Sequence, residues 1–469
     1  MHKNKIFTLI QSFTQKELKE IKLFLASPYY NTQPLYSNYL DLLVKSKSKA
    51  PSKEEIYSRM FPGETFSDIK LRLINSQLLQ LVEQYLVIKK MESDELYQVI
   101  ALSQTYRSRE LKKHYLHHRA ASYRILQDQT VQNADYFAGK YAIEMENYHF
   151  ESGLQRSKVL NLQQISDTID TAFLTFKLRQ TCLMMAHQSV FKTEYQFGLL
   201  DALLPEITMK NRLDTPAISV YYYCFKSLID PNDKTYFEKF KSEVLAHYHL
   251  FPPEEARDLF LLATNYCIKK TNEGRDEFAV DALDLYEKAL DKELLVQNGV
   301  LSRFSYANIV NMGLKSGKLD FVAQFIQQYK AYLEIKHLTS AYSFNMARLE
   351  YARKNYEAVI ELLRNAEYKD LITNLTAKTI LLKVFFEMGA FNLLESHLDA
   401  MNTFIRRKRK VISYHELNCL NIIKYTKKIL SLNPFDKAEK NLLREQIEKE
   451  EMLTERKWLV ERLGVSGKN

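Results

Sequence analysis

Residues that turn a backbone sharply are scarce in this chain. Only 11 glycines and 10 prolines occur among 469 residues, whereas the two together make up about 12% of an average protein. β-Hairpins need glycine or asparagine at positive φ, and doubly wound α/β folds need glycine in their turns. Connections between helices manage with asparagine, aspartate, serine and lysine. The scarcity therefore argues against sheet-rich folds and predicts an all-α protein.

Long apolar runs are missing as well. The start of the chain carries only the apolar run 6–10 before polar residues, which is too short for a secretory signal. The most apolar internal run, 259–268, has about half of the ~20 residues that span a bilayer. We therefore expect no export by this route, no membrane span and a cytoplasmic location.

Cysteine is rare, and the few cysteines lie far apart with no CxxC pair. Disulfide frameworks and zinc sites usually show closely spaced cysteines. Isolated cysteines within apolar helical sequence instead behave as small core residues, and free thiols are the rule in a reducing compartment. This interpretation applies to four positions: Cys182, Cys224, Cys267 and Cys419.

Apolar and aromatic residues are abundant. Hydrophobic residues make up 46% of the chain and charged residues 26%, with 30 tyrosines and 26 phenylalanines, so the whole chain has enough apolar surface to fold. Its length exceeds what one hydrophobic core normally supports, which implies several domains or an elongated array. The tyrosine clusters 29–30 and 221–223 offer rings that could stack on the bases of a nucleic acid. Consecutive rings face several sides of a helix, however, so we expect these tyrosines to pack between helices.

A helical period of 3.6 residues dominates the chain. Thr14 with Glu17, and Ser52 with Glu55, have the spacing of capping boxes at two helix starts. After Ser67 a wide apolar face predicts a long helix buried on more than one side. We interpret 1–92 as a basic helical N-terminal unit. Region 93–254 is expected to hold successive long helices, and whether it continues the array described next stays open.

A repeat is visible from about residue 255. The pattern Ala282-x3-Tyr286-x2-Ala289-Leu290 closely resembles the second helix of a tetratricopeptide repeat, with 259–268 as its first helix. Three further helix pairs follow, and equivalent positions are separated by 40, 37 and 35 residues, close to the ~34 of that family. These positions are Ala282, Val322, Val359 and Leu394. The resemblance covers 255–410 and implies an α-α superhelix whose surface binds other proteins.

Two departures from the family pattern stand out. The glycine of the first helix is replaced by Val310, Ala347 and Leu382, and the closing proline is missing from every unit, so the repeats are degenerate. Segment 411–469 is expected to supply C-terminal helices and a cap, with one long charged helix over 435–463 covering the end of the array. The complete pattern, from SPYYN at its front to ERKWL near its end, is also similar to bacterial helical-repeat proteins without a known activity.

Catalytic motifs fail on their chemistry. Gly317-Lys318 resembles the end of a phosphate-binding loop, but Met312 stands where the first glycine is needed and Leu319 where the hydroxyl is needed. The stretch from His415 begins like a helical zinc-protease motif, yet Cys419 takes the place of the second histidine. We therefore expect a protein that is not an enzyme and that has no cofactor and no metal site.

Basic charge is concentrated in two places. Residues 1–130 carry a net charge of +7, and residues 401–430 carry +7 as well. The second cluster contains a basic run, which we place in a connection between Ile405 and Val411 because five consecutive side chains surround a helix. A solvated turn is the simpler interpretation, whereas phosphate contacts with strong salt dependence would mark nucleic-acid binding. The run consists of Arg406, Arg407, Lys408, Arg409 and Lys410.

Two functions remain open. The first is a non-catalytic scaffold that binds a peptide or helix of a partner protein on the superhelix surface. The second is a nucleic-acid-associated regulator that uses the basic clusters at 1–130 and 406–428. Polar positions on the first helices of the repeats are the candidate partner contacts, and each is expected to be exposed: Asn308, Lys315, Asn345 and Arg348. The sequence leaves the oligomeric state and the identity of the partner undetermined.

Overall fold

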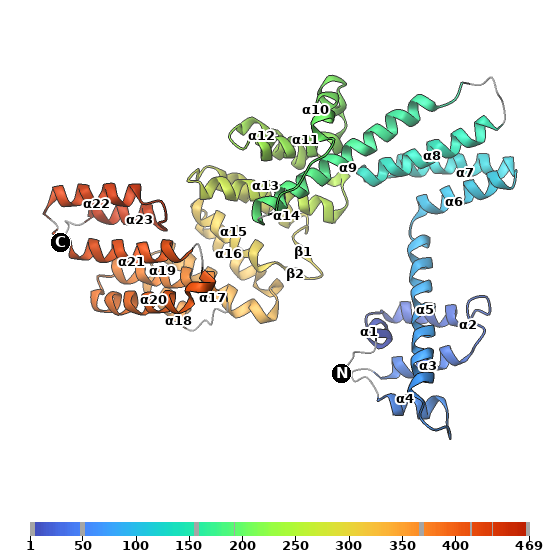
Figure 1. Ribbon diagram of the computed structural model, residues 1–469, viewed down its shortest axis with the longest axis horizontal. Helices are drawn as coiled ribbons and strands as arrows, with labels where there is room; N and C mark the ends of the chain where they lie inside the picture. The colour runs from blue at the N-terminus through green and yellow to red at the C-terminus, as the bar shows by residue number, and fades with distance from the viewer. Residues whose placement is uncertain are drawn as a thin grey trace. The chain divides into compact units, whose positions relative to one another are not determined.

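The computed structural model describes residues 5–46, 52–153, 159–191, 193–364, 370–412, 415–433 and 435–465. In these residues the chain forms 23 α-helices, three short 3-10 helices and one two-stranded hairpin (Figure 1), which confirms the all-α prediction. Two compact units are present. Unit 1 comprises 1–179 with 199–212, and unit 2 comprises 180–198 with 213–469. Their boundaries differ from those of the four predicted segments, 1–92, 93–254, 255–410 and 411–469.

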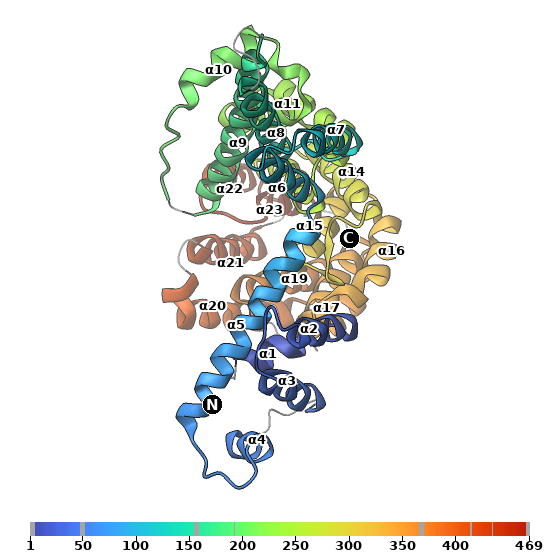
Figure 2. The same ribbon diagram turned by 90° about the vertical axis from the view of Figure 1, so that its right-hand side faces the viewer.

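Unit 1 begins with four short helices that contact one long helix, α5 (Asp68–Glu92). Figure 2 shows the short helices beside this long helix. The amphipathic spacing of each helix explains the arrangement, because Ile21, Leu40 and Leu78 are fully buried in one shared apolar cluster. The short helices are α1 (Lys5–Gln11), α2 (Gln15–Ala26), α3 (Leu35–Lys45) and α4 (Lys53–Met60).

Local sequence signals at the start of unit 1 are confirmed in part. Thr14 and Glu17 form the complete capping box of α2, and Ser52 caps α4 through the Glu55 amide at 3.1 Å. The Glu55 carboxylate pairs with an arginine one turn later instead of returning to Ser52. The expected burial of α5 on several sides is wrong at its first turns, where Ile69 and Leu73 are exposed because α1–α4 cover only one face.

Helices also fill the middle of the chain, as expected for 93–254. The stacked rings of Tyr115 and Phe150, with centroids 3.8 Å apart, join α7 to α8. The boundary between the two units falls within α9, after Arg179. The elements of this middle region are, in chain order, α6 (Glu95–Ser108), α7 (Lys112–Asp128), α8 (Ala134–Ser152), α9 (Leu162–Val190), α10 (Leu200–Met209) and η1 (Arg212–Asp214).

After the last part of α9, unit 2 continues with four helices that pack as consecutive pairs. Tyr221 and Tyr222 on the first of them are buried between helices, and the Tyr221 hydroxyl donates to the Glu255 carboxylate at 2.6 Å. All four cysteines are free and buried, which confirms their interpretation as core residues. The elements are α11 (Pro216–Ile229), α12 (Lys234–His247), η2 (Tyr248–Leu250), α13 (Pro253–Asn272) and α14 (Phe278–Asp291).

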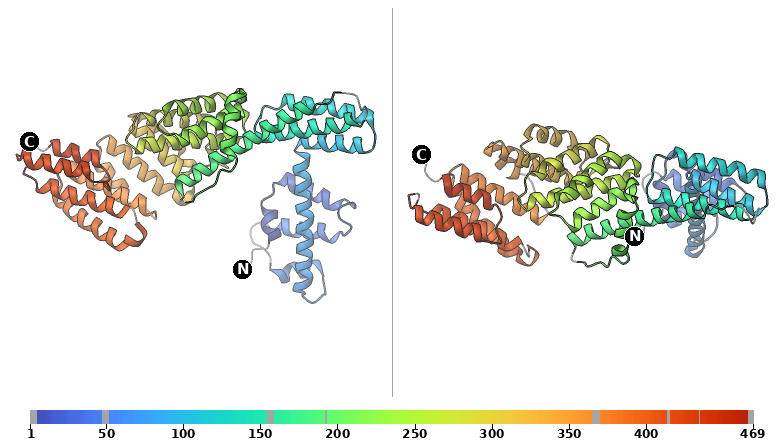
Figure 3. Two further views of the ribbon diagram at one scale, coloured as in Figure 1. Left: turned by 45° about the horizontal axis from the view of Figure 1, so that its top comes forward. Right: turned by 90° about the horizontal axis from the view of Figure 1, so that it is seen from above.

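A short antiparallel hairpin, β1 (Val296–Gln297) and β2 (Val300–Leu301), separates α14 from the next helices. Its turn residues Asn298 and Gly299 both have positive φ, as a tight hairpin requires. Six helices then form three pairs, and in addition α15 contacts α17 and α17 contacts α19. These six helices, together with one 3-10 helix, are α15 (Arg303–Lys315), α16 (Leu319–Tyr329), η3 (Lys330–Tyr332), α17 (Ile335–Ala352), α18 (Tyr356–Arg364), α19 (Leu371–Glu387) and α20 (Phe391–Ile412). Figure 3 shows rows of neighbouring helices in this orange and red part of the chain.

The same turn joins the two helices of each pair from α13 to α20. One residue adopts a left-handed φ, and the amide after it donates to a carbonyl five residues earlier at 2.9–3.1 Å. This is the Schellman ending of a helix, which satisfies carbonyls that the helix itself leaves free. The left-handed residues are Gly274, Gly317, Lys354 and Gly389. The predicted turns around 316–319, 354–356 and 389–391 are therefore confirmed.

Replacement of Lys354 by glycine should raise the free energy of unfolding by about 0.5–1 kcal/mol. Lys354 is the only one of these four turn residues with a Cβ, and a side chain in the left-handed region costs roughly 1–2 kcal/mol, partly offset by the greater freedom of glycine in the unfolded chain. The matched reverse change is Gly317→Ala, where a Cβ meets no neighbouring atom and only the backbone cost remains. Urea denaturation followed by the fluorescence of the single tryptophan in the sequence measures both. A loss of stability in the Lys354 variant would contradict this explanation.

The C-terminal segment differs from the predicted single helix over 435–463. It forms two helices, α22 (Lys437–Lys449) and α23 (Arg456–Val465), after α21 (His415–Ser431). The break ends at Glu455, whose φ is 57° and whose carboxylate accepts from Lys383 Nζ at 2.8 Å. The chain therefore folds back, and Trp458 and Leu459 enter the same core as α19–α21.

Candidate functional site

Two of the four predicted partner contacts lie on α15 and are engaged within the chain. Asn308 is half-buried and hydrogen-bonds the Tyr286 hydroxyl. Lys315 is exposed at the end of the helix, where its Nζ lies 3.3 Å from Asp276 Oδ1. Lys457, near the start of α23, reaches the other oxygen of Asp276 at 2.8 Å. Asn308 is thus half-buried where exposure was expected, whereas Lys315 is exposed as expected and takes part in an internal charge cluster.

Arg348 lies on α17 and is also not free. Its guanidinium donates to the Asn311 side chain and lies 5.8 Å from the centre of the Phe344 ring. Burial lowers the pKa of Arg348 to about 10, against an opposing contribution from Glu455. The side chain therefore stays charged at neutral pH, and it is half-buried where exposure was expected.

Asn345, the last of the four, is 1% exposed. Its Nδ2 donates to the Ala341 carbonyl at 2.8 Å, whereas its Oδ1 has no hydrogen-bond partner and an accessible area below 1 Å². The bond to Ala341 fixes the orientation of the amide, because a flipped amide would place two oxygens against each other. A buried acceptor without a donor costs about 1–3 kcal/mol. Such groups are rare in folded proteins, and a functional role is one explanation for them.

Asn345 lines a cavity in unit 2 with a volume of about 150 Å³. The lining residues come from the first turns of α15, from the N-terminal half of α17 and from the start of α19. We name this site the α17 groove, defined by Arg303, Phe304, Lys336, Phe344, Asn345 and Asp370. The sequence prediction found only Asn345 among these residues.

The wall of the α17 groove is apolar and aromatic. Phe304 is 67% exposed, although a side chain of this size is usually buried, and Ala307 continues its face one turn later. Phe344 and Ala341 supply the opposite wall from α17, and Phe344 is buried. Small alanines beside two phenylalanines leave room for an inserted apolar side chain, which is the common composition of ligand pockets.

The polar rim of the groove carries two basic side chains, Arg303 and Lys336, and two carboxylates, Asp370 and the neighbouring Glu334. The Arg303 guanidinium lies 4.7 Å from the centre of the Phe304 ring, and Lys336 pairs with Glu334 at 2.5 Å in an exposed ion pair. Asp370 is committed to its own helix, because the Thr373 amide and hydroxyl both donate to its carboxylate. Burial raises the pKa of Asp370, but the two bonds from Thr373 outweigh it and lower that pKa below its usual value.

The basic run at 406–410 is not a connection between helices, as the sequence suggested. It lies within α20, because the buried face formed by Leu398, Met401 and Ile405 continues the helical spacing to this point. Arg406, Arg407 and Lys408 are exposed on the other faces of the helix. The side chains of the last two residues of the run, Arg409 and Lys410, lie outside the described part of the structure.

The lysines of the second half of this basic cluster, on α21, have partners. Lys427 Nζ lies 2.8 Å from an oxygen of Asp399, and Lys428 donates to Gln446 at 2.8 Å. Lys424 approaches Glu450 at 4.0 Å. These contacts reduce the charge that the cluster presents to a polyanion, because part of it is neutralised within the chain.

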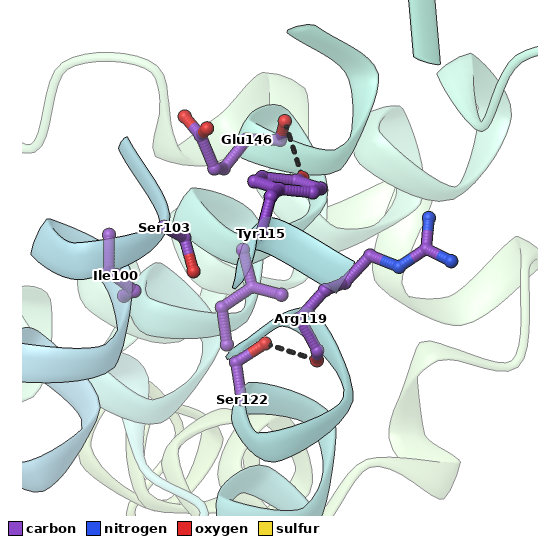
Figure 4. Close-up of a pocket in the computed structure, with 7 residues that line it drawn as sticks. Ile100, Ser103, Tyr115, Arg119, Ser122 and Glu146 are labelled. Atoms are coloured by element: carbon purple, nitrogen blue, oxygen red, sulfur yellow. Dashed lines mark hydrogen bonds between the residues drawn. The ribbon is translucent and has the colours of Figure 1, made fainter. Parts of the chain in front are cut away.

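A second cavity, in unit 1, is too small for a ligand. It measures about 10 Å³ between α6, α7 and α8 and holds at most one water. Figure 4 shows the Tyr115 hydroxyl donating to the Glu146 carbonyl, and the Arg119 side chain pointing away from Tyr115. The Glu146 carboxylate accepts from Arg107 at 2.6 Å. All these polar groups already have partners within the chain, so this cavity belongs to the core of unit 1.

Two surveys of the described residues complete the search. No helix in the described ranges is long and apolar enough to cross a membrane. Among the same residues, no group of three or more histidine, cysteine, aspartate or glutamate side chains has the geometry to hold a metal ion. Comparison of the chain with protein-family models, with curated proteins and with solved structures gives no match in any of the three.

Proposed function

We propose that this protein is a non-catalytic cytoplasmic scaffold whose helices α13–α20 form a tetratricopeptide-like superhelix and whose α17 groove binds a segment of a partner protein. The repeated Schellman turns support the superhelix, since they join each pair in the same way. The contacts of α17 with both α15 and α19 support it further, because first helices of successive repeats pack on each other.

The main support for a binding role is that two features which lower the stability of the free chain occur together in the α17 groove. Phe304 exposes most of its ring, and Asn345 buries an acceptor that has no donor. Each lowers the stability of the free chain, and a bound peptide would remove both, by covering the ring and by donating a hydrogen bond. The basic run of α20 keeps nucleic acid as a second candidate, since Arg406, Arg407 and Lys408 are exposed together.

A photocrosslinking amino acid placed at Phe304 is expected to capture one discrete protein from living cells of the source organism. The matched control position is Phe435, which is 90% exposed and lies outside the groove. Adducts are analysed with and without nuclease. In the same cells, Phe304→Ala should weaken partner binding by about tenfold or more, as expected for an aromatic anchor.

Three outcomes decide between the candidates. A nuclease-resistant protein adduct at position 304 and not at 435 supports the groove. Equal labelling at both positions, or none at 304, contradicts it. Retention of nucleic acid that disappears when Arg406, Arg407 and Lys408 are changed to glutamate would favour the second candidate instead.

A further inference from the structure

We infer that the α17 groove selects an extended peptide in which an apolar side chain stands next to an acidic one. This inference rests on the proposed function and names the chemistry of the ligand. Three features of the groove carry it: the unpartnered acceptor of Asn345, the aromatic wall, and the basic rim.

The unpartnered oxygen of Asn345 favours a ligand with an extended main chain. Asn345 Oδ1 can only accept a hydrogen bond, because an amide oxygen carries no hydrogen, and the bond from Nδ2 to Ala341 excludes the flipped orientation of the amide. Main-chain N–H groups inside a helix are used by the helix, whereas those of an extended segment are free to donate. The accessible area of Oδ1 is below 1 Å², so the side chains that line the groove must turn aside when the peptide enters.

The rim determines the charge of the ligand. Arg303 and Lys336 are the basic lining residues of the groove, and the one carboxylate among the groove residues, Asp370, accepts from Thr373 and also interacts with the charge of Arg303. Lys336 pairs with Glu334 in a solvent-exposed contact, which a ligand carboxylate can replace at little cost. The first turn of α17 also lacks a side-chain cap, so its partly positive amides favour an anion.

The wall determines the side chain beside that carboxylate. Phe304 lies under the Arg303 guanidinium, so a side chain that packs on the exposed ring places its neighbour within reach of the charge. An aliphatic or aromatic group buries the ring and excludes water from the new ion pair, which strengthens that pair. The two requirements therefore fall on adjacent residues of the ligand.

Selection from a displayed library of random 12-residue peptides against the full chain tests the inference. Peptides selected by the wild-type chain are expected to share an apolar residue next to Asp or Glu. The double variant Arg303→Glu/Lys336→Glu should bind them at least about tenfold more weakly and should itself select Lys or Arg at the acidic position. The matched control, Arg444→Glu/Lys449→Glu on the exposed face of α22, carries the same change of charge outside the groove and should stay within about twofold.

A second measurement tests the hydrogen bond to Asn345. Methylation of one main-chain nitrogen in a selected peptide is expected to reduce its affinity for the wild-type chain about tenfold. The same methylation should have no effect on binding to Asn345→Leu, because the two changes remove the same bond. Equal losses in both chains would overturn the extended mode of binding.

The outcomes separate this inference from the function on which it rests. Selected peptides that need Phe304 but carry neutral or basic residues overturn the inference and leave the binding groove in place. Failure to select any peptide that depends on Phe304, together with no protein adduct at position 304, removes the proposed function and the inference together.

Discussion

Replacement of Glu387 by alanine is expected to lower the free energy of unfolding of unit 2 by about 3–5 kcal/mol. The carboxylate at the end of α19 is 9% exposed and accepts from three separate helices. Tyr351 and Tyr356 donate at 2.8 and 2.6 Å, Trp458 Nε1 donates at 2.6 Å, and Arg462 lies 3.5 Å away. Alanine would remove the acceptor of the Tyr351 and Tyr356 hydroxyls and of Trp458 Nε1 in a region that little water reaches.

The conservative variant Glu387→Gln separates charge from shape. Its side-chain oxygen still accepts some of the bonds, but the amide brings two donors of its own against donors that are already present. We expect a loss of about 1–3 kcal/mol, smaller than for alanine. Urea denaturation, followed by the fluorescence of Trp458, measures both variants. Equal stability of the alanine variant and the wild type would show that the carboxylate is not the centre of this contact.

The same carboxylate predicts a dependence on pH. Burial raises the pKa of Glu387, but the bonds from Tyr356, Trp458 and Tyr351 and the charge of Arg462 outweigh it, so the pKa lies below its usual value of 4.5. Its contribution to stability is therefore complete above about pH 4.5 and is lost as the pH falls through the lower pKa of the folded state. The stability difference between wild type and Glu387→Gln should shrink below pH 4.5. A constant difference between pH 7 and pH 3 would contradict this.

Phe237→Ala is expected to lower the free energy of unfolding of unit 2 by about 3–5 kcal/mol. The side chain is fully buried, and its ring stacks on Tyr266 of α13 with centroids 4.4 Å apart and meets Phe278 of α14 at 5.6 Å. One ring on α12 therefore holds two further helices. Removal leaves a cavity that rigid aromatic neighbours cannot collapse to fill.

Matched variants identify the cause of this loss. Phe237→Leu keeps most of the volume and should lose about 1.5 kcal/mol. Phe435→Ala removes the same ring from an exposed position and should change stability by no more than about 0.5 kcal/mol. Thermal and urea unfolding of the three variants provide the comparison. A similar loss for Phe435→Ala would indicate a general effect of ring removal and not of packing.

Helix positions were predictable because they depend on local spacing. The capping of α2 by Thr14 and the turns at Gly317 and Gly389 follow from residues within a few positions of each other. The hairpin at Asn298-Gly299 has the turn sequence most typical of a tight hairpin, but the scarcity of glycine and proline in the whole chain argues against sheet-rich folds and favours helices. A count over the chain cannot exclude a turn of two residues.

The α17 groove was largely unpredictable because it depends on distances between helices. Asn345 was selected as a polar position between core residues, yet its burial results from contacts with α15 and α19 that no local pattern shows. Arg303 and Phe304 follow the capping residue Ser302, and an exposed aromatic residue in a first turn was the one available signal. Five consecutive basic side chains surround a helix and therefore predict a connection at 406–410, but the buried face formed by Leu398, Met401 and Ile405 continues α20 through 406–408.

The fold-back at Glu455 determines the order in which the C-terminal core is completed during synthesis. Tyr351, Tyr356 and Glu387 leave the ribosome before Trp458, which contacts the same carboxylate from a position 71 residues further along the chain. Until α23 docks, that carboxylate and the apolar surface beneath it are open to water and to other chains. Trp458 is thus the last of these residues to be synthesised, and its helix α23 covers the Glu387 carboxylate. A chain interrupted before Arg456 lacks α23 and leaves this carboxylate exposed.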